Sequence, residues 1–450
     1  MQSNKSEVQT IYDNYKNSGI EWLGDIPKHW EVKRVKDISQ TKSGTTPHSG
    51  NKNYYENGEF NWIRTTDLND GELYEVEYKV TQLALDECRL NFLPIDTVLV
   101  AMYGGFGTIG KNSILKKLST INQSVCAILP SRKLDANYFM YFLKYFRVDW
   151  KLFADGARKD PNINQDAVKN LFFFYPPLPE QTAIAQYLDT KTQAIDKKIK
   201  ILTQKTETYK ELRKSIINEA VCKGLDKNVK LKESGVEWIG QIPAHWEVKR
   251  LKDIAKVQTG NTPPMSDKDN YSEIGFPWVK PNELFDLIPT FSTADFISET
   301  GKEQVRFIKK GSVMVCCIGS IGKMGVAGVD LCTNQQINSI MFYKIIPEFG
   351  KYLIFVSKDE HIRHSTGNVV AILNCENQKR IEFAFPPLSE QTAIANYLDE
   401  KTQKIDAIIS NLQSSISHCK ELRKTLINDV VTGKIKVIDK SLYNEQHKII

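Results

Sequence analysis

The chain contains the same framework twice, and this duplication constrains its fold more than any other feature. Residues 18–38 return as residues 234–254 with 16 of 21 positions identical. A second block, PPLPEQTAIAQYLDTKTQAIDKKI at 176–199, returns at 386–409 with 18 of 24 positions identical. The stretches between these blocks have diverged far more. A period above 200 residues is too long for a solenoid, whose repeats span about 20–50 residues, so the sequence predicts a duplicated domain pair that carries two different inserts.

Composition and charge describe an ordinary globular chain. Of its 450 residues, 41% are hydrophobic and 25% are charged, as in typical soluble domains. A net charge of +6 permits contact with a polyanion without requiring it. Eight cysteines without CxxC spacing indicate free, buried thiols in a reducing compartment. The chain lacks both an apolar signal region and the ~20-residue apolar stretch of a spanning helix, so we expect a cytoplasmic protein without membrane contact.

Both inserts are predicted to be mixed α/β. Each alternates short β-rich segments with Gly-, Asn- and Ser-rich turns and contains one helix-periodic apolar segment, at 137–153 and 348–364. The predicted strands lie at 60–65, 96–103 and 124–130 in the first insert, and at 276–280, 312–319 and 338–345 in the second. The predicted organisation is a polar leader (1–19), a first domain (20–175), a central helix (176–224), a linker (225–233), a second domain (234–385), a C-terminal helix (386–434) and a tail (435–450).

Each insert ends in a proline-rich stop, and a long helical pattern follows. Residues 180–221 contain no Pro or Gly, and apolar residues recur there with 4-3 spacing over four heptads, which predicts a coiled coil. The two helices are expected to pair with each other in antiparallel orientation, although a surface helix packed on its own domain is the alternative. The predicted coiled-coil residues are Leu188, Ile195, Ile199, Leu202, Tyr209 and Ile216, and Leu398, Ile405, Ile409, Leu412, Ile416 and Leu426.

No catalytic constellation is recognisable. The segment GFGTIGKNS matches a P-loop frame at Gly105, Gly110 and Lys111, but Asn112 stands where Ser or Thr would bind magnesium, and Cys317 replaces the first glycine in the second copy. The shared IGK tripeptide instead predicts a tight turn with a lysine at its tip. Methyltransferase tetrapeptides, GxSxG, HExxH and His/Cys clusters are missing. We therefore predict no catalytic residue and no metal site. The histidines at 361 and 364 are expected to be solvated or to face phosphate.

The turns and loops of both inserts are rich in residues of the types that contact phosphates and base edges. Such residues are also the default for any exposed loop, so this pattern alone does not establish binding. The candidate DNA-binding residues are Ser43, Thr45, Thr46, Lys52, Asn53, Tyr54, Arg64, Thr65, Lys111, Arg158, Lys159, Asn162, Asn164 and Gln165 in the first insert, and Asn261, Thr262, Lys268, Asn270, Tyr271, Lys280, Asn282, Lys323, Arg363, His364, Asn368 and Asn374 in the second.

Together, the IPxHWEVKRLKDI segment, the Gly-x-Thr-Pro turn, the FxWIR and FPWVK strands and the PPLxEQTAIAxYLDxKTxxID helix start resemble the specificity subunits of type I restriction-modification systems. The similarity extends from about Ile20 to about Gly433 in both copies. It implies two target recognition domains, each recognising one half of a split double-stranded DNA sequence. It further implies two long helices that form an antiparallel coiled coil and fix the distance between the halves.

The same resemblance implies a subunit without catalytic activity. Its partners would be two modification (methyltransferase) subunits and endonuclease subunits, and S-adenosylmethionine, ATP and magnesium would be bound only by those partners. Two other classes stay open from the sequence. One is a coiled-coil adaptor protein without DNA contact, and the other is a DNA methyltransferase or nuclease with fused recognition domains.

Overall fold

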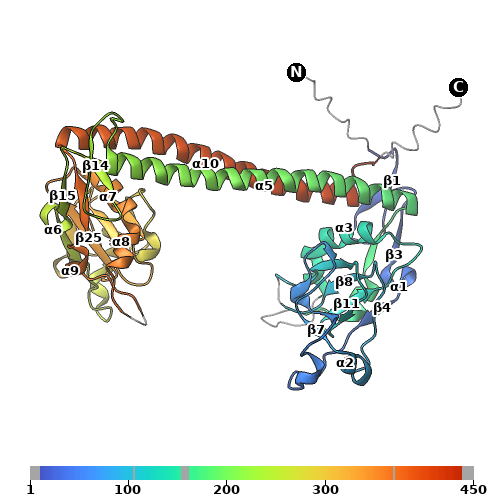
Figure 1. Ribbon diagram of the computed structural model, residues 1–450. Coiled ribbons are helices and arrows are strands. Elements are labelled where there is room, and N and C mark those ends of the chain that lie inside the picture. Colours follow the sequence, from blue (N-terminus) through green and yellow to red (C-terminus); the bar gives the residue numbers. More distant parts are fainter. Residues whose placement is uncertain (1–10, 105–106, 154–161, 368–369, 438–450) are drawn as a thin grey trace. The chain divides into compact units, whose positions relative to one another are not determined.

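The computed structural model describes residues 11–104, 107–153, 162–367 and 370–437 (Figure 1). The chain divides into two compact units, one formed by Met1–Ile201 with Ser415–Ile450 and the other by Leu202–Ser414. Each unit holds one insert, one copy of the framework, and part of each of two long helices, α5 (Leu178–Lys223) and α10 (Leu388–Val431). The expected class is confirmed, because both inserts are mixed α/β and both helices are continuous.

The first unit is built around a five-stranded sheet with the order β4-β11-β8-β9-β6, antiparallel except for the β6–β9 pair. A three-stranded sheet, β10-β5-β7, packs beside it. The strands are β4 (Thr41–Ser43), β5 (Phe60–Ile63), β6 (Glu72–Leu73), β7 (Lys79–Val80), β8 (Val98–Ala101), β9 (Asn112–Leu115), β10 (Thr120–Ile121) and β11 (Val125–Ile128). The helices of this insert are α2 (Gln82–Glu87), α3 (Ala136–Phe146) and α4 (Gln165–Asn170).

The second unit repeats this plan. Its main sheet has the order β16-β25-β22-β23-β19, and a second sheet has the order β17-β20-β18-β24-β21. The strands are β16 (Ala255–Thr259), β17 (Tyr271–Ser272), β18 (Phe276–Val279), β19 (Pro289–Thr290), β20 (Phe296–Ile297), β21 (Phe307–Ile308), β22 (Val313–Cys316), β23 (Met324–Ala327), β24 (Leu331–Thr333) and β25 (Ile337–Phe342). Its helices are α7 (Pro347–Val356), α8 (Lys358–Arg363) and α9 (Cys375–Gln378).

In each unit the framework strand pairs with the last strand of the insert. The EVKR strand β3 (Glu31–Arg34) pairs antiparallel with β12 (Phe172–Tyr175), and β15 (Glu247–Arg250) pairs in the same way with β26 (Glu382–Phe385). A single helical turn follows each framework strand, as α1 (Val35–Ile38) and α6 (Leu251–Ile254). The proline stop and the long helix come directly after β12 and β26, so this pairing brings the two repeated sequence blocks together.

The long helices pair within each unit. In the first unit the start of α5 shares a hydrophobic core with the end of α10, through Leu188 and Val430 among others. In the second unit the end of α5 shares a core with the start of α10. This arrangement is antiparallel. Ion pairs accompany it in both units, with Arg423 Nε 2.9 Å from Asp196 Oδ1 and Arg213 Nε 2.8 Å from Asp406 Oδ1.

The burial of side chains along both helices follows the heptad pattern. All twelve predicted coiled-coil residues are buried or half-buried. Four apolar residues outside the predicted seam, Ile201, Leu212, Ile408 and Leu422, are 38–49% exposed. Others outside it, such as Ile184 and Ile217, are fully buried in the hydrophobic cores of their units. Burial along these helices therefore follows the seam and, near the helix ends, also the packing against each domain.

The structure differs from the sequence-based expectations in three places. The predicted helix at 137–153 ends at Phe146 and continues as a 3-10 helix, Arg147–Phe153. The predicted helix at 348–364 is interrupted at Ser357, whose hydroxyl donates to the Ile354 carbonyl at 3.0 Å. Strands also form in the expected leader and linker, where β1 (Tyr15–Asn17) pairs with β2 (Asp25–Pro27) and β13 (Leu231–Glu233) pairs with β14 (Gln241–Pro243).

Truncation of a seam leucine should destabilise the second unit far more than truncation of an exposed leucine on the same pair of helices. Leu398 is fully buried, whereas Leu212 is 44% exposed. We expect Leu398→Ala to lower the free energy of unfolding by about 2–5 kcal/mol, because it leaves a cavity, and Leu212→Ala to change it by less than about 0.5 kcal/mol. Denaturant unfolding of both variants measures this difference, and equal losses would contradict the seam.

Candidate nucleic-acid interface

The Gly-x-Thr-Pro turn of the first unit is locked against the end of β10 and the loop that follows it. The backbone of Gly44 lies so close to that segment that an added Cβ would overlap the Ile121 carbonyl. The amide of Thr45 donates to the Ile121 carbonyl at 3.2 Å, and the indole Nε1 of Trp62 donates to the Thr45 carbonyl at 3.1 Å. Gly44 therefore permits the close contact between the two backbone segments, and the hydrogen bond from Trp62 helps to hold it.

The second unit repeats this lock with partly different residues. A Cβ added at Gly260 would overlap the Thr333 carbonyl. The amide of Asn261 donates to the same carbonyl at 3.0 Å, and the indole of Trp278 donates to the Asn261 carbonyl at 3.3 Å. The two inserts thus diverge in sequence but keep one rigid loop pair in common.

An exposed glutamine lies at the tip of each locked loop. The hydroxyl of Thr46 donates to Gln123 Oε1, and the hydroxyl of Thr262 donates to Gln335 Oε1. Neither glutamine was predicted as a site residue. The signal that could have identified them is the Asn-Gln dipeptide, which occupies matching positions in INQS and TNQQ.

A cation lies next to each of these loops. The amide of Asn122 donates to the Ile63 carbonyl at 2.9 Å. Arg64 directly follows Ile63 and stacks on Tyr78, with its guanidinium carbon 3.4 Å from the ring centroid. In the second unit Lys280 follows Val279, whose carbonyl accepts from Asn334 at 3.1 Å. Arg64 contacts Asp67 at 3.3 Å and Lys280 contacts Asp295 at 2.7 Å.

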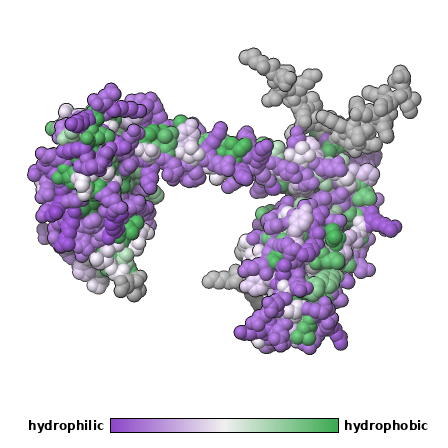
Figure 2. Space-filling view, in the orientation of Figure 1, coloured by the Kyte–Doolittle hydropathy of each residue, from purple (hydrophilic) through white to green (hydrophobic). Residues whose placement is uncertain are grey.

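Most of the predicted DNA-binding residues lie on the surface of the two units. Figure 2 shows hydrophilic side chains over most of the visible face of each unit. The exposed candidates are Ser43, Thr45, Thr46, Lys52, Asn53, Asn164, Lys268, Asn282, Arg363 and Asn374. The half-buried candidates are Tyr54, Arg64, Thr65, Lys111, Asn162, Gln165, Asn261, Thr262, Tyr271, Lys280, Lys323 and His364. Arg158, Lys159 and Asn368 lie outside the described residues.

Asn270 does not belong to an accessible surface. Its side chain is fully buried, where Nδ2 donates to the Pro264 carbonyl at 3.4 Å and Oδ1 accepts from Gln304 at 2.7 Å. The prediction that Asn270 contacts DNA is therefore corrected, because both ends of its amide are used inside the protein. The expectation that His361 is solvated is also wrong, since its ring is fully buried and Nδ1 lies 2.8 Å from the Ser357 carbonyl oxygen.

Several other candidates have local structural roles. Asn164 and Asn374 accept backbone N–H groups at the starts of α4 and α9, each at 2.8 Å. The Tyr271 hydroxyl donates to the Pro263 carbonyl at 2.7 Å. Arg363 contacts Glu237 and Glu360, each at 3.3 Å. These side chains shape the loops whether or not they also meet a ligand.

The IGK segments form tight turns, with φ of +73° at Gly110 and +80° at Gly322. The side chain of Lys323 bends back, and its Nζ donates to the Pro281 carbonyl at 2.8 Å. This ammonium group is held against the protein rather than projecting from the tip of the turn. Gly105, which completed the match to a P-loop, lies outside the described residues.

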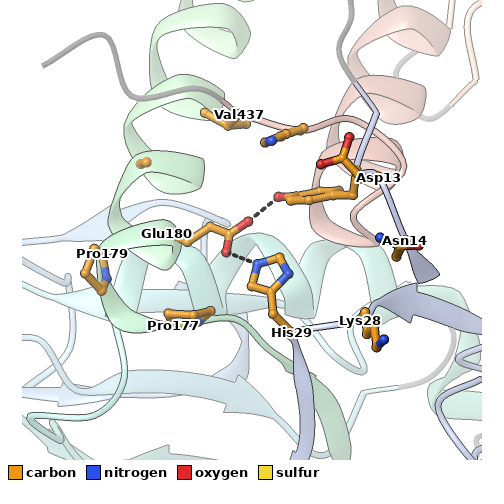
Figure 3. A pocket seen from close by; sticks show the side chains of 11 residues that line it. Asp13, Asn14, Lys28, His29, Pro177, Pro179, Glu180 and Val437 are labelled. Atoms are coloured by element: carbon orange, nitrogen blue, oxygen red, sulfur yellow. Dashed lines mark hydrogen bonds and ion pairs between the residues drawn. The ribbon is translucent and has the colours of Figure 1, made fainter. Parts of the chain in front are cut away.

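The framework contributes to a pocket in each unit that contains a histidine–glutamate pair. In the first unit His29 Nε2 lies 2.8 Å from Glu180, and the buried Tyr12 hydroxyl donates to the same carboxylate (Figure 3). Burial, and secondarily this hydrogen bond, raises the pKa of Tyr12. In the second unit His245 lies 2.6 Å from Glu390, which also accepts from the Trp246 indole at 3.1 Å. The two pockets have volumes of about 580 and 320 Å³.

Within the described ranges, no group of three or more His, Cys, Asp or Glu side chains could hold a metal ion. The eight cysteines are free, and six of them are buried. Burial raises the pKa of the Cys126 thiol to about 12. No helix in the described part of the chain is long and apolar enough to cross a membrane.

These features define a protein of two homologous α/β units, each carrying one locked loop pair and one framework pocket beside paired long helices. The chain belongs to the family of type I restriction modification DNA specificity domains, whose model matches residues 27–207 and 243–418. The MjaIX specificity subunit of a type I restriction enzyme from Methanocaldococcus jannaschii is 25% identical over 434 residues, which cover 92% of this chain and 95% of the relative.

Two solved structures have the same fold. One is a chain from a study of complex assembly and conformational transition of the type I R-M system, with a TM-score of 0.72 and 16% identity, covering 90% of this chain and 98% of that chain. The other is the HsdS subunit from Thermoanaerobacter tengcongensis, with a TM-score of 0.54 and 16% identity, covering 91% and 98%.

Acid should destabilise the second unit through the buried His361. Burial lowers the pKa of this imidazole from 6.5 to about 4, so the folded state favours its neutral form. The resulting stability is present above pH 6.5 and is lost as the pH falls toward 4. We expect the free energy of unfolding to fall by about 2 kcal/mol more between pH 7 and pH 5 in the parent than in His361→Met. Denaturant unfolding at both pH values tests this, and equal declines would contradict it.

Proposed function

We propose that this chain is the sequence-specific DNA-binding specificity subunit of a type I restriction-modification complex. Each recognition domain binds one half of a bipartite double-stranded DNA target, and the paired helices set the length of the spacer between the halves. The observation that carries this proposal is the combination of two nearly identical frameworks with two unlike inserts. A framework that is repeated serves the same purpose twice, whereas inserts that differ can recognise different sequences.

The surfaces of the inserts are suited to DNA. Their exposed loops offer amide, hydroxyl, guanidinium and ammonium groups, which are the donors used for phosphates and base edges. The rigid loop pairs at Gly44 and Gly260 hold some of these donors in fixed positions. Preorganised donors favour specific recognition because less side-chain entropy is lost on binding.

The framework pockets are suited to two copies of one partner. Both are built from equivalent residues, with His29 and Glu180 in one unit matching His245 and Glu390 in the other. Two similar surfaces on one chain can engage two identical subunits, in line with the two methyltransferase subunits that the family resemblance implies. Endonuclease subunits would complete the complex. In this proposal the chain has no catalytic activity, and S-adenosylmethionine, ATP and magnesium are bound by its partners.

Exchange of one insert should change one half of the recognised sequence. We expect replacement of residues 39–175 by the corresponding insert of a relative to alter one half-site and to leave the other half-site and the spacer unchanged. Mapping of methylated adenines in cells that carry the assembled complex measures both halves at once. A matched replacement of residues 255–385 should alter the opposite half. A change in both halves, or in neither, would contradict the assignment of one half-site to each insert.

Lengthening both helices should lengthen the spacer. Seven residues inserted between Ile199 and Leu202, and seven between Ile409 and Leu412, preserve the heptad seam and extend each helix by about 10 Å. This length corresponds to roughly three base pairs at ~3.4 Å each. We expect the variant to prefer a longer spacer with both half-sites unchanged, and to bind more weakly because the half-sites also rotate by about 100° around the DNA axis.

Binding-site selection with randomised spacers measures this preference. A control variant with two-residue insertions at the same positions turns the following seam residues by about 200° around each helix and should disrupt the helical pair. A folded seven-residue variant that keeps the parent spacer would show that the helices do not determine its length.

A further inference from the structure

The strongest feature outside the framework is the side-chain group that both inserts keep despite their divergence. In the first unit it consists of Thr46, Gln123 and Arg64, and in the second of Thr262, Gln335 and Lys280. Each group contains a hydroxyl, an exposed amide and a cation, supplied by three segments that backbone hydrogen bonds tie together. We call these groups the Thr–Gln–cation clusters.

Rigid backbone supports each glutamine. The loop around Gln123 is fixed on one side by the amide of Asn122, which donates to Ile63, and is capped by Asn122 Oδ1, which accepts from the Ser124 amide at 3.0 Å. The loop around Gln335 has the same cap, with Asn334 Oδ1 accepting from the Gln336 amide at 3.1 Å. Each glutamine is therefore an exposed side chain on a backbone segment that hydrogen bonds hold in place.

The glutamine side chain is oriented as well as supported. Its Oε1 accepts from the threonine hydroxyl in both units, which leaves the Nε2 donors pointing away from that contact. Among the described residues, neither Nε2 has a hydrogen-bond acceptor of its own. Ordering an exposed glutamine costs side-chain entropy that one neutral hydrogen bond can at best balance. The fixed amide is thus poorly explained by folding stability alone.

Each cation also retains free donors. Arg64 is held by Tyr78 and Asp67, and Lys280 by Trp278 and Asp295, while their side chains stay 27% and 34% exposed. A guanidinium has five N–H donors and an ammonium has three. One carboxylate partner fixes the position of each cation without using all of these donors.

Because both units share the Thr–Gln–cation cluster, it cannot account for the difference between two unlike half-sites. Its ligand must be a feature common to both halves. Amide and cationic donors together select an anion, and the anion common to any DNA sequence is the backbone phosphate. We propose that the two Thr–Gln–cation clusters each bind a DNA phosphate and set the register of the duplex on their recognition domain. This inference rests on the proposed function, because it assumes that both inserts bind DNA.

The test uses the assembled complex and DNA that carries its bipartite site. We expect Gln123→Ala and Gln335→Ala each to weaken binding about tenfold at constant salt, as for one hydrogen bond to a charged acceptor. The double variant should lose about a hundredfold, because distant sites are additive. The recognised motif should stay the same in all three. Gln193→Ala and Gln403→Ala, which remove exposed glutamines at equivalent positions on α5 and α10, are matched controls that should bind like the parent.

The threonine variants separate orientation from simple loss of structure. Thr46→Val should weaken binding nearly as much as Gln123→Ala, whereas Thr46→Ser keeps the hydroxyl and should restore binding. If the parent complex binds its site and the glutamine variants bind equally well, the proposed phosphate contact is overturned and the proposed function is not. Relaxed preference at one base position would also overturn it, because that result identifies a base contact. A parent complex that fails to bind any bipartite DNA would instead overturn the proposed function.

Discussion

A buried glutamine at the start of each long helix joins the recognition domain to the helical pair, and the rest of the fold depends on this joint. Gln181 and Gln391 are almost completely buried. Gln181 accepts from the amide of Asp135, at the start of α3, and donates to the Pro176 carbonyl, both at 2.9 Å. Gln391 does the same with Ile346 and Pro386 at 3.1 and 2.9 Å. Loss of such an amide would leave buried backbone groups unpaired, at about 1–3 kcal/mol each.

This joint explains how the inserts can differ while the framework does not. The hydrogen bonds of the glutamine side chain go to backbone groups of the insert and of the proline stop, and the EVKR strand also pairs with the backbone of β12 or β26. Neither interaction depends on which side chains the insert presents elsewhere. An insert is therefore compatible with the framework when its last strand, its main helix and the proline stop have the right geometry. Sequence divergence is left to the loops, where recognition is expected.

The sequence predicted the architecture well because its strongest signals are local or repeated. Heptad spacing identified seam residues such as Leu188 and Leu398 without knowledge of the partner helix. The position of Asn270 could not be foreseen, because an asparagine in a polar loop looks the same whether its amide meets solvent or Gln304. Gln123 and Gln335 were missed for a related reason. Their significance comes from contacts with Thr46 and Thr262, which lie more than 70 residues away in the sequence.

In the two copies of the framework, the equivalent carboxylates of Glu180 and Glu390 accept hydrogen bonds from partly different donors. In the second unit Glu390 accepts from both His245 and the Trp246 indole. In the first unit Tyr12 takes the place of the indole, and Trp30 Nε1 is buried without a protein partner in the described part of the chain. A buried donor without an acceptor is costly, and the ring contact between Tyr12 and Trp30, at 5.8 Å, offsets part of that cost. Both solutions keep the histidine–glutamate pair in the lining of the pocket. The feature that the copies share at this carboxylate is thus the pair itself, while its second hydrogen-bond donor differs.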